Sequence, residues 1–276
     1  MMVVTQKSII ADLQSQREID PKIEIRNRIN FLKEYLVQSG ANGFVLGISG
    51  GQDSTLAGKL AQLAVDELNQ EATTKSVSFY AIRLPYGEQF DEEDAKAAVE
   101  FIAPTKTLTI NIKEAVDASV RAFEAATGET LSHFAKGNTK ARERMKAQYD
   151  VAAHYGCLVI GTDHSAEAIT GFFTKHGDGA CDIVPLFGLS KRQGKALLKE
   201  LGAPGHLYTK APTADLEDDK PGLPDEVALG MTYEQLDDYL EGRSVQAEVK
   251  EKIEARYIQT EHKRQLPVTI FDTWWR

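Results

Sequence analysis

The chain has few cysteines and no long apolar run, and each absence excludes a class of protein. Only two cysteines, Cys157 and Cys181, occur among its 276 residues, too few for a disulfide framework or a cysteine-ligated zinc site. No apolar stretch approaches the roughly 20 residues that a membrane-spanning helix needs. The N-terminus lacks the apolar core and small-residue cleavage site of a signal peptide. We therefore expect a cytoplasmic protein that does not contact a membrane.

Charge and motif content exclude further classes. With 32 basic against 41 acidic residues, the formal net charge is −9, which argues against broad binding to nucleic acid. No two of the six histidines show H-x-x-x-H spacing, so a zinc site on one helix face is not expected. The chain has neither G-x-x-x-x-G-K-[ST] nor G-x-G-x-x-G, which excludes a Walker A loop and a dinucleotide fingerprint.

Four short apolar runs alternate with segments of helical periodicity. The runs are GFVLGIS, VSFYAIRL, KTLTINI and CLVIG, and predicted helices follow them, for example over 53–68 and 91–102. This alternation is typical of an α/β fold with a doubly wound, mainly parallel sheet and helices on both faces. We predict a single domain over 1–276, with an N-terminal helical extension over about 1–40 and a C-terminal helical and tail region over about 225–276.

Polar segments follow three of the predicted strands: SGGQDS, RLPYG and GTDHSAE. Ligands of parallel sheets bind at the carboxyl ends of the strands, so these segments are expected to share one site. In the first segment, Gly50 and Gly51 allow positive φ and close approach of a ligand, and Ser49 and Ser54 add hydroxyl donors. A lone glycine pair is usually an ordinary turn, but a pair between a strand and a helix N-terminus indicates an anion site suited to phosphate.

An acid in the phosphate loop implies a metal. Asp53 would repel phosphate unless a cation lies between them, and a hard divalent ion such as Mg²⁺ would bind both. A second acid should reach the same ion, and Glu167, just past the fourth strand, is the best-placed candidate. The alternative is that Glu167 is a solvated acid on a helix surface.

Three further residues are candidates for the site. Arg83, at the end of the second strand, suits phosphate binding or stacking on a base. Lys191, at the start of KRQGKALLKELG, would neutralise phosphate charge or be a plain surface lysine. Asp178, between two glycines, is either an acid at a reacting centre or a turn residue, and the spacing leaves both interpretations open.

The loop SGGQDS resembles the SGGxDS loop of the N-type ATP pyrophosphatases, which adenylate a substrate and release pyrophosphate. Longer segments narrow the resemblance to the ammonia-dependent NAD⁺ synthetases, from about residue 20 to the C-terminus: LGISGGQDSTLAGKLAQLA, IRLPYG, GNTKARERMKAQY, GTDHSAEAITGFFTKHGDGACDIVPL, KAPTADLEDDKPGLPDE and TEHKRQLP. The resemblance implies an adenine nucleotide alpha hydrolase-like fold.

The resemblance also implies roles for individual residues. ATP would be held by Gly47, Ile48, Ser49, Gly50, Gly51, Gln52, Asp53, Ser54, Arg83, Thr162, Lys191 and Thr213. Mg²⁺ would be bound by Asp53 and Glu167, as the charge argument suggested. Deamido-NAD⁺ would be contacted by Asn138, Arg142, Phe172, Lys175, Asp182, His262 and Lys263, across the interface of a homodimer to which residues 137–149 and the C-terminal tail contribute.

The implied reaction is the ATP-dependent amidation of deamido-NAD⁺ with ammonia to NAD⁺, AMP and pyrophosphate, through an acyl-adenylate. Asp178 is our hypothesis for the acid that binds and deprotonates ammonium. Neither cysteine has the context of an amidase nucleophile, so free ammonia is the expected nitrogen donor, unless a separate amidase subunit delivers it. The acidic stretch over 211–226 is predicted to be a mobile surface loop that orders over ATP.

Two other functions compete with this one. A tRNA sulfurtransferase with the same loop type would have a basic surface and usually catalytic cysteines, whereas this chain is acidic and has neither. A non-catalytic protein that senses ATP would not require two metal-binding acids and a basic pocket for a second nucleotide.

Overall fold

The structure is a computed structural model, and it describes residues 4–71, 75–87, 92–210, 212 and 222–276. Thr213 and most of the acidic stretch over 211–226, for which we predict a mobile loop, lie outside the described residues. In chain order the elements are α1 (Gln6–Asp12), α2 (Pro21–Ser39), β1 (Gly43–Gly47), α3 (Gln52–Glu71), β2 (Ser78–Arg83), α4 (Glu92–Ile102), β3 (Lys106–Thr109), α5 (Lys113–Thr127), α6 (His133–Tyr155), β4 (Leu158–Val159), α7 (Ser165–Thr170), α8 (Lys191–Glu200), α9 (His206–Thr209), α10 (Asp225–Leu229), α11 (Tyr233–Leu240), α12 (Ala247–Gln259) and α13 (Glu261–Arg264).

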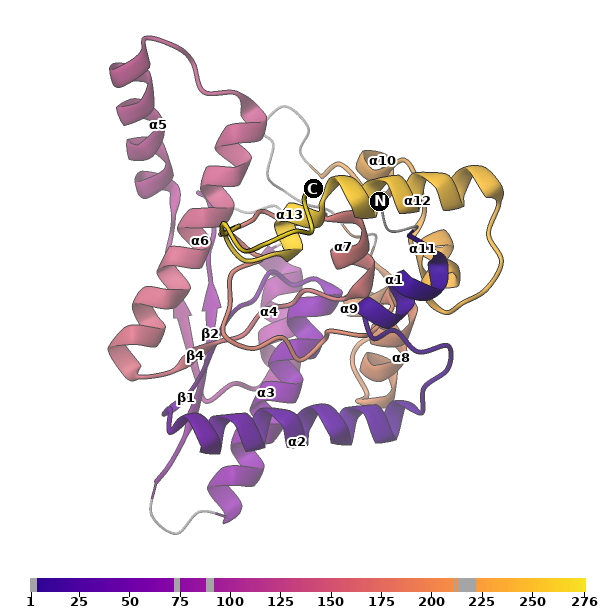
Figure 1. Cartoon of the computed structure of the whole chain (residues 1–276). Coiled ribbons are helices and arrows are strands. Elements are labelled where there is room, and N and C mark those ends of the chain that lie inside the picture. Colours follow the sequence, from indigo (N-terminus) through magenta and orange to yellow (C-terminus); the bar gives the residue numbers. More distant parts are fainter. Residues whose placement is uncertain (1–3, 72–74, 88–91, 211, 213–221) are drawn as a thin grey trace.

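The described strands form one parallel sheet in the order β3-β2-β1-β4 (Figure 1). β1 pairs with β2 over its whole length but with β4 at only two positions, Phe44 with Leu158 and Val45 with Val159. Beyond that point the chain after β4 turns away from β1, and Ile160 forms an isolated bridge with Ile183. The predicted α/β fold with a parallel sheet is confirmed, although β4 is shorter than the apolar run CLVIG suggests.

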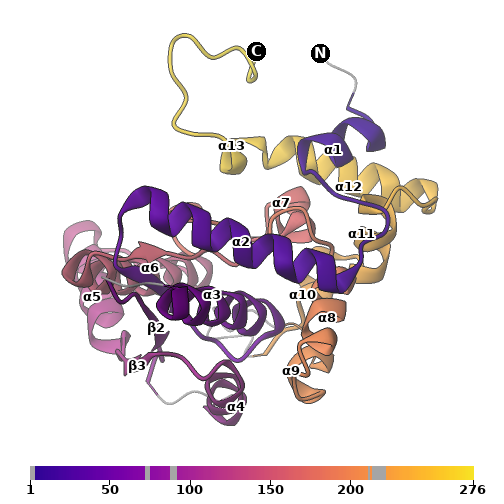
Figure 2. The same cartoon turned by 90° about the horizontal axis from the view of Figure 1, so that it is seen from below.

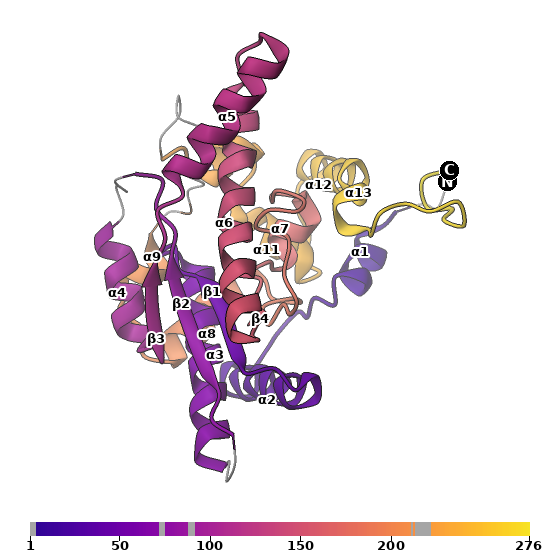
Figure 3. The same ribbon diagram turned by 90° about the vertical axis from the view of Figure 1, so that its left-hand side faces the viewer.

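The central strands β1 and β2 are buried on both faces, which explains why they are continuous apolar runs, whereas the edge strand β3 is mostly exposed. Phe44 and Leu46 of β1 pack in a core with α2, α3, α4 and α8. Val45, between them in the chain, points to the opposite face and packs with α5 and α6. Figure 3 shows α6 lying across one face of the sheet, with α3 behind it. Successive side chains of a strand alternate between faces, so one apolar run supplies both cores.

A third apolar cluster lies away from the sheet. It joins helices from both ends of the chain to α7, through Ile9 and Leu13 of the α1 region, Ile169 of α7, Leu236 of α11 and Ile253 of α12. The hydroxyl of Tyr257 on α12 also donates to Asp12 on α1, at 2.5 Å. Figure 2 shows α1 beside α12, on the far side of α2 from the sheet. None of the described helices combines the length and apolarity that a membrane span needs.

Candidate active site

A pocket of about 710 Å³ opens at the carboxyl edge of the sheet, within the size range of ligand sites. Its floor is the end of β1 and the loop into α3, and its walls come from Leu84, from the segment over 160–162 and from α6, α7 and α12. All three polar segments that follow strands therefore contribute to one site, as we predicted. The second contributes only through Leu84.

The two loop glycines serve different purposes. Gly50 has φ +81°, and a Cβ there would lie 2.6 Å from the backbone nitrogen of Ala95, at the start of α4. Glycine is therefore required by the close approach of α4, and this residue does not line the pocket. Gly51 lines the pocket, but our expectation of positive φ is wrong for it, because its backbone lies in the ordinary region.

Hydroxyls hold the loop in its turn. The hydroxyls of Ser49 and Ser54 lie 3.0 Å apart, and the amide of Gly51 donates to Ser49 Oγ at 3.3 Å. The side-chain amide of Gln52 donates through Nε2 to the backbone carbonyl of Lys191 at 2.9 Å, which connects the loop to α8. The loop and the start of α3 thus present backbone amides and hydroxyls to the pocket, an arrangement suited to anionic oxygens.

Lys191 is a buried partner of Asp53. Its Nζ lies 2.6 Å from Asp53 Oδ2, and the two side chains are only 9% and 19% exposed. The start of α8 is fixed by a capping box at Ser190 and by Asp237, which accepts the backbone amides of Lys191 and Arg192. These contacts aim the lysine into the pocket, so it is not a plain surface lysine.

Burial and neighbouring charges shift the pKa values of three acids near the loop in different directions. Burial is the largest influence on Asp53 and acts to raise its pKa, but Lys191 and then His164 outweigh burial, so the pKa of Asp53 is lowered. Burial, with the nearby Asp53, raises the pKa of Glu167 well above its usual value. Burial and then Asp178 raise the pKa of Asp163 to about 7. Asp53 and Glu167 therefore stand beside the phosphate loop as two acids of different basicity.

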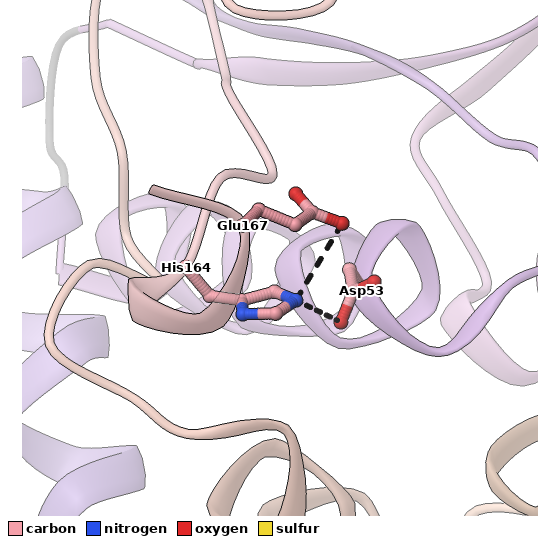
Figure 4. A group of neighbouring side chains, drawn as sticks. All are labelled: Asp53, His164 and Glu167. Atoms are coloured by element: carbon pink, nitrogen blue, oxygen red, sulfur yellow. Dashed lines mark ion pairs between the residues drawn. The ribbon is translucent and has the colours of Figure 1, made fainter. Parts of the chain in front are cut away.

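Asp53, His164 and Glu167 form a compact group, with ligand atoms within 4.8 Å of one another (Figure 4). His164 Nδ1 accepts the backbone amide of Ala166 at 3.2 Å, which places the imidazole proton on Nε2. Because a protonated nitrogen cannot ligate a metal, the donors left to a cation are carboxylate oxygens. Such oxygens fit a hard ion such as Mg²⁺. Glu167 is mostly buried in this group and is not a solvated surface acid.

The other half of the pocket holds Asn138, Phe172, Asp178 and Lys263. The Thr174 hydroxyl donates to Asn138 Oδ1 at 2.9 Å, and the Thr174 amide donates to Asp178 Oδ1 at 3.0 Å. Asp178 lines the pocket, and burial raises its pKa. It is thus both a turn residue and an acid at the pocket wall, so the two interpretations do not exclude each other.

Lys263 is anchored to the same loop. Its ammonium donates to the carbonyls of Gly171 and Phe173, at 2.8 and 2.7 Å. Burial lowers the pKa of Lys263. Lys191 near the phosphate loop and Lys263 near Asp178 are therefore two fixed cations of the pocket, which is also lined by Arg144, Lys210 and Arg256.

The predicted residues divide into those that line the pocket and those that do not. Lining it are Gly47, Ile48, Ser49, Gly51, Gln52, Asp53, Ser54, Asn138, Thr162, Glu167, Phe172, Asp178, Lys191 and Lys263. Outside its lining are Gly50, Arg83, Arg142, Lys175, Asp182 and His262. Three of the latter are engaged by other groups. Arg83 is paired with Glu92, and Asp182 accepts the Val159 amide at 2.7 Å. The ammonium of Lys175 donates to the carbonyls of His262 and Gln265.

Sequence reasoning missed several residues. His164 is the N-cap of α7, and its position directly before SAEAIT was a usable signal. Gln148, on α6, accepts the amide of Gly47 at 2.7 Å, and Arg144 donates to the carbonyl of Leu84 at 3.1 Å. Both line the pocket. No local pattern marks them, because they reach the sheet from a remote helix.

A strand–loop–helix anion site, a carboxylate pair and a pocket at the carboxyl edge of a parallel sheet define a nucleotide-binding α/β protein. The family model described as NAD synthase matches residues 24–267. The chain belongs to the NAD synthase family.

Individual relatives agree with this assignment. The chain is 72% identical to the NH(3)-dependent NAD(+) synthetase of Halalkalibacterium halodurans and 63% identical to that of an Exiguobacterium species, over 98% of this chain and 100% of each relative. The crystal structure of NAD+ synthetase from Burkholderia pseudomallei superposes with a TM-score of 0.82 at 46% identity, covering 95% of this chain and 96% of that one. The structure of NMN synthetase from Francisella tularensis has a TM-score of 0.80 at 35% identity, covering 92% of this chain and 100% of that one.

Proposed function

We propose that this chain is an ammonia-dependent NAD⁺ synthetase, which converts deamido-NAD⁺, ATP and ammonia into NAD⁺, AMP and pyrophosphate. The observation that carries the proposal is the buried Lys191–Asp53 pair beside Glu167, at the mouth of the SGGQDS loop. One pocket joins this group to Asn138 and Asp178. It thus offers a phosphate region and a second region for the molecule that is activated.

The phosphate region is proposed for ATP. The loop from Gly47 to Ser54 would surround the phosphates with amides and hydroxyls, and Thr162 lines the wall beside it. Arg83 and Thr213 complete the proposed set, although Arg83 is engaged by Glu92 in this structure. Lys191 would neutralise phosphate charge from the side, because its pKa is raised: burial opposes its charge, but Asp53 and Glu167 outweigh burial.

Asp53 and Glu167 are proposed to hold Mg²⁺. Their shared position next to the loop fits a hard cation that also contacts phosphate oxygens. When bound, Mg²⁺ stabilises the charge that develops on a departing pyrophosphate. The two acids keep the ion on the loop side of the pocket, and Lys191 fixes the orientation of Asp53.

The reaction is proposed to proceed in two displacements. A nicotinate carboxylate oxygen forms a bond to the α-phosphorus of ATP, and the bond to the leaving pyrophosphate breaks, which leaves an acyl-adenylate. Ammonia then forms the carbon–nitrogen bond, and AMP leaves with the carboxyl oxygen. Asp178 is proposed to bind ammonium and accept its proton, a task for which a raised pKa makes its carboxylate more basic.

Deamido-NAD⁺ is proposed to bind across a homodimer interface. Asn138, Phe172 and Lys263 line the pocket, whereas Arg142, Lys175, Asp182 and His262 lie outside its lining. Residues of the second group would meet the ligand if a second copy continued the pocket. Large apolar side chains are exposed nearby in sequence, and they support such an interface: Phe134, Ile258, Leu266, Ile270 and Phe271.

Pyrophosphate release tests the proposed function. Purified protein with ATP, Mg²⁺ and NH₄⁺ should release pyrophosphate only when deamido-NAD⁺ is added, and NAD⁺ should appear in equal amount. Nicotinate mononucleotide is the matched comparison, because one structural relative is an NMN synthetase, and it should support much slower release. Release that ignores the added nucleotide would refute the proposal.

A further inference from the structure

His164 is held rigidly between the two proposed metal-binding acids. Its side chain is only 2% exposed, and it lies at the N-terminus of α7, where Nδ1 accepts the Ala166 amide. One ring nitrogen is therefore occupied by the helix, and the ring cannot rotate without breaking this cap. Because Nδ1 accepts a hydrogen bond, the proton of the imidazole lies on Nε2.

The second ring nitrogen faces both carboxylates. Nε2 lies 3.6 Å from Asp53 Oδ1 and 3.6 Å from Glu167 Oε1, and Figure 4 marks both pairs with dashed lines. Among the described residues it has no hydrogen-bond partner. One N–H thus lies between two acceptors. Both distances slightly exceed that of a direct hydrogen bond, and a small movement of either acid would complete the bond.

The remaining contacts of Asp53 make this position significant. Lys191 binds Oδ2, which leaves Oδ1 facing His164. Among the described residues, Glu167 has no lysine within ion-pair distance, and Asp53 lies beside it. Two acids that share a site disfavour each other's negative charge, and a hydrogen-bond donor between them offsets this cost.

We infer that His164 is a positioning residue whose Nε2–H keeps Asp53 and Glu167 converged on one cation position. It does not ligate the metal, because the helix cap places its proton on the nitrogen that faces the acids. The inference rests on the proposed metal role of the two acids. At other metal sites, residues that hydrogen-bond to the ligands orient them in this way, and loss of such a residue weakens metal affinity about 10- to 100-fold.

A substitution can separate positioning from helix capping. Asparagine is a favoured N-cap, so His164→Asn keeps an oxygen acceptor for the Ala166 amide but is too short to reach the acids. Mn²⁺ serves as the probe, titrated against the protein with α,β-methylene-ATP and followed by its electron paramagnetic resonance signal. We expect Mn²⁺ affinity to fall about 10- to 100-fold, with a melting temperature close to that of the wild type. Activity should recover at high Mg²⁺, since the acids themselves remain.

Thr5→Ala is the matched control, because it removes the N-cap of the distant helix α1. It should lower the melting temperature without changing Mn²⁺ affinity. An unchanged affinity in His164→Asn, or a loss that Thr5→Ala reproduces, would overturn the inference. The titration needs no turnover, so a failure of the proposed reaction would appear separately, as absent pyrophosphate release by the wild type.

Discussion

Replacing Lys191 with methionine should make the folded chain lose stability as the pH rises. The lysine is the close cation for Asp53, at 2.6 Å, and methionine keeps most of its length without its charge. At an effective dielectric constant of about 20, an attraction across this distance amounts to about 6 kcal/mol before desolvation is subtracted. Removing one partner of a buried pair costs about 3–5 kcal/mol, since the other charge stays buried.

The pH dependence gives this prediction its sign. In the wild type the pKa of Asp53 is lowered, so its stabilising effect is present above the ordinary carboxyl pKa and is lost as the pH falls through the folded value. In Lys191→Met burial is no longer outweighed, and the folded pKa of Asp53 lies above its unfolded value. The variant then gains by protonating Asp53 at low pH. Between the unfolded and the folded pKa of Asp53 in the variant, the loss of unfolding free energy relative to the wild type therefore grows by about 1.4 kcal/mol per pH unit.

Urea unfolding in metal-free buffer at about pH 4.5 and pH 8 measures this difference. Lys195→Met is the matched control, because Lys195 lies one turn further along α8 and is exposed. We expect a loss of about 3–5 kcal/mol for Lys191→Met at pH 8, a smaller loss at pH 4.5, and little change for the control. An equal loss at both pH values, or equal losses in both variants, would refute the reasoning.

Three further changes probe other parts of the site. Gly50→Ala should destabilise the fold by more than about 2 kcal/mol, because positive φ alone costs about 1–2 kcal/mol and the new Cβ would lie 2.6 Å from the Ala95 nitrogen; thermal unfolding measures this. Asp178→Asn should lower kcat/KM for ammonium by about 10²–10⁴-fold if the residue accepts the proton, as steady-state kinetics at varied NH₄⁺ would show. Leu266→Glu, at a side chain 85% exposed, should shift a dimer towards monomer in light scattering and lower activity with it.

Each of these changes has a control. Gly51→Ala has ordinary φ and a nearest contact of 3.4 Å, so it should fold normally and weaken ATP binding alone. Glu248→Gln, a surface change in an exposed ion pair, sets the baseline for Asp178→Asn; equal losses would end the role proposed for Asp178. Val227→Glu introduces the same charge at an exposed position on α10. If Leu266→Glu and Val227→Glu both produced a monomer, the effect at Leu266 would no longer indicate an interface there.

The sheet could be predicted because its signal is local. Strands of a parallel sheet are short runs rich in apolar and β-branched residues, and four such runs stand in the sequence between helical segments. The length of β4 could not be predicted, since CLVIG contains only two residues paired with β1. Its end is set by the bridge of Ile160 to Ile183, a contact that only the folded chain defines.

The site was predictable where chemistry follows a strand and unpredictable where it depends on packing. Asp53 and Glu167 were found because each follows a strand end, and the structure brings them together. Whether Lys191 was buried or exposed stayed open, because its partner lies 138 positions away in the chain. His164 could not be found from the spacing of histidines, because this histidine is placed by a helix cap and not by a second histidine on the same helix.

At the end of β1, the side chain of Gln148 accepts a backbone hydrogen bond that a longer β4 would otherwise accept. β1 and β4 separate after Val45, and the amide of Gly47 is bound by Gln148 Oε1 at 2.7 Å. The same helix carries Asn138, which faces the other half of the pocket. A displacement of α6 by a ligand at Asn138 would stretch the bond on Gly47. The rate of amide hydrogen exchange at this one glycine would therefore report, from inside the phosphate loop, what happens three turns away on α6.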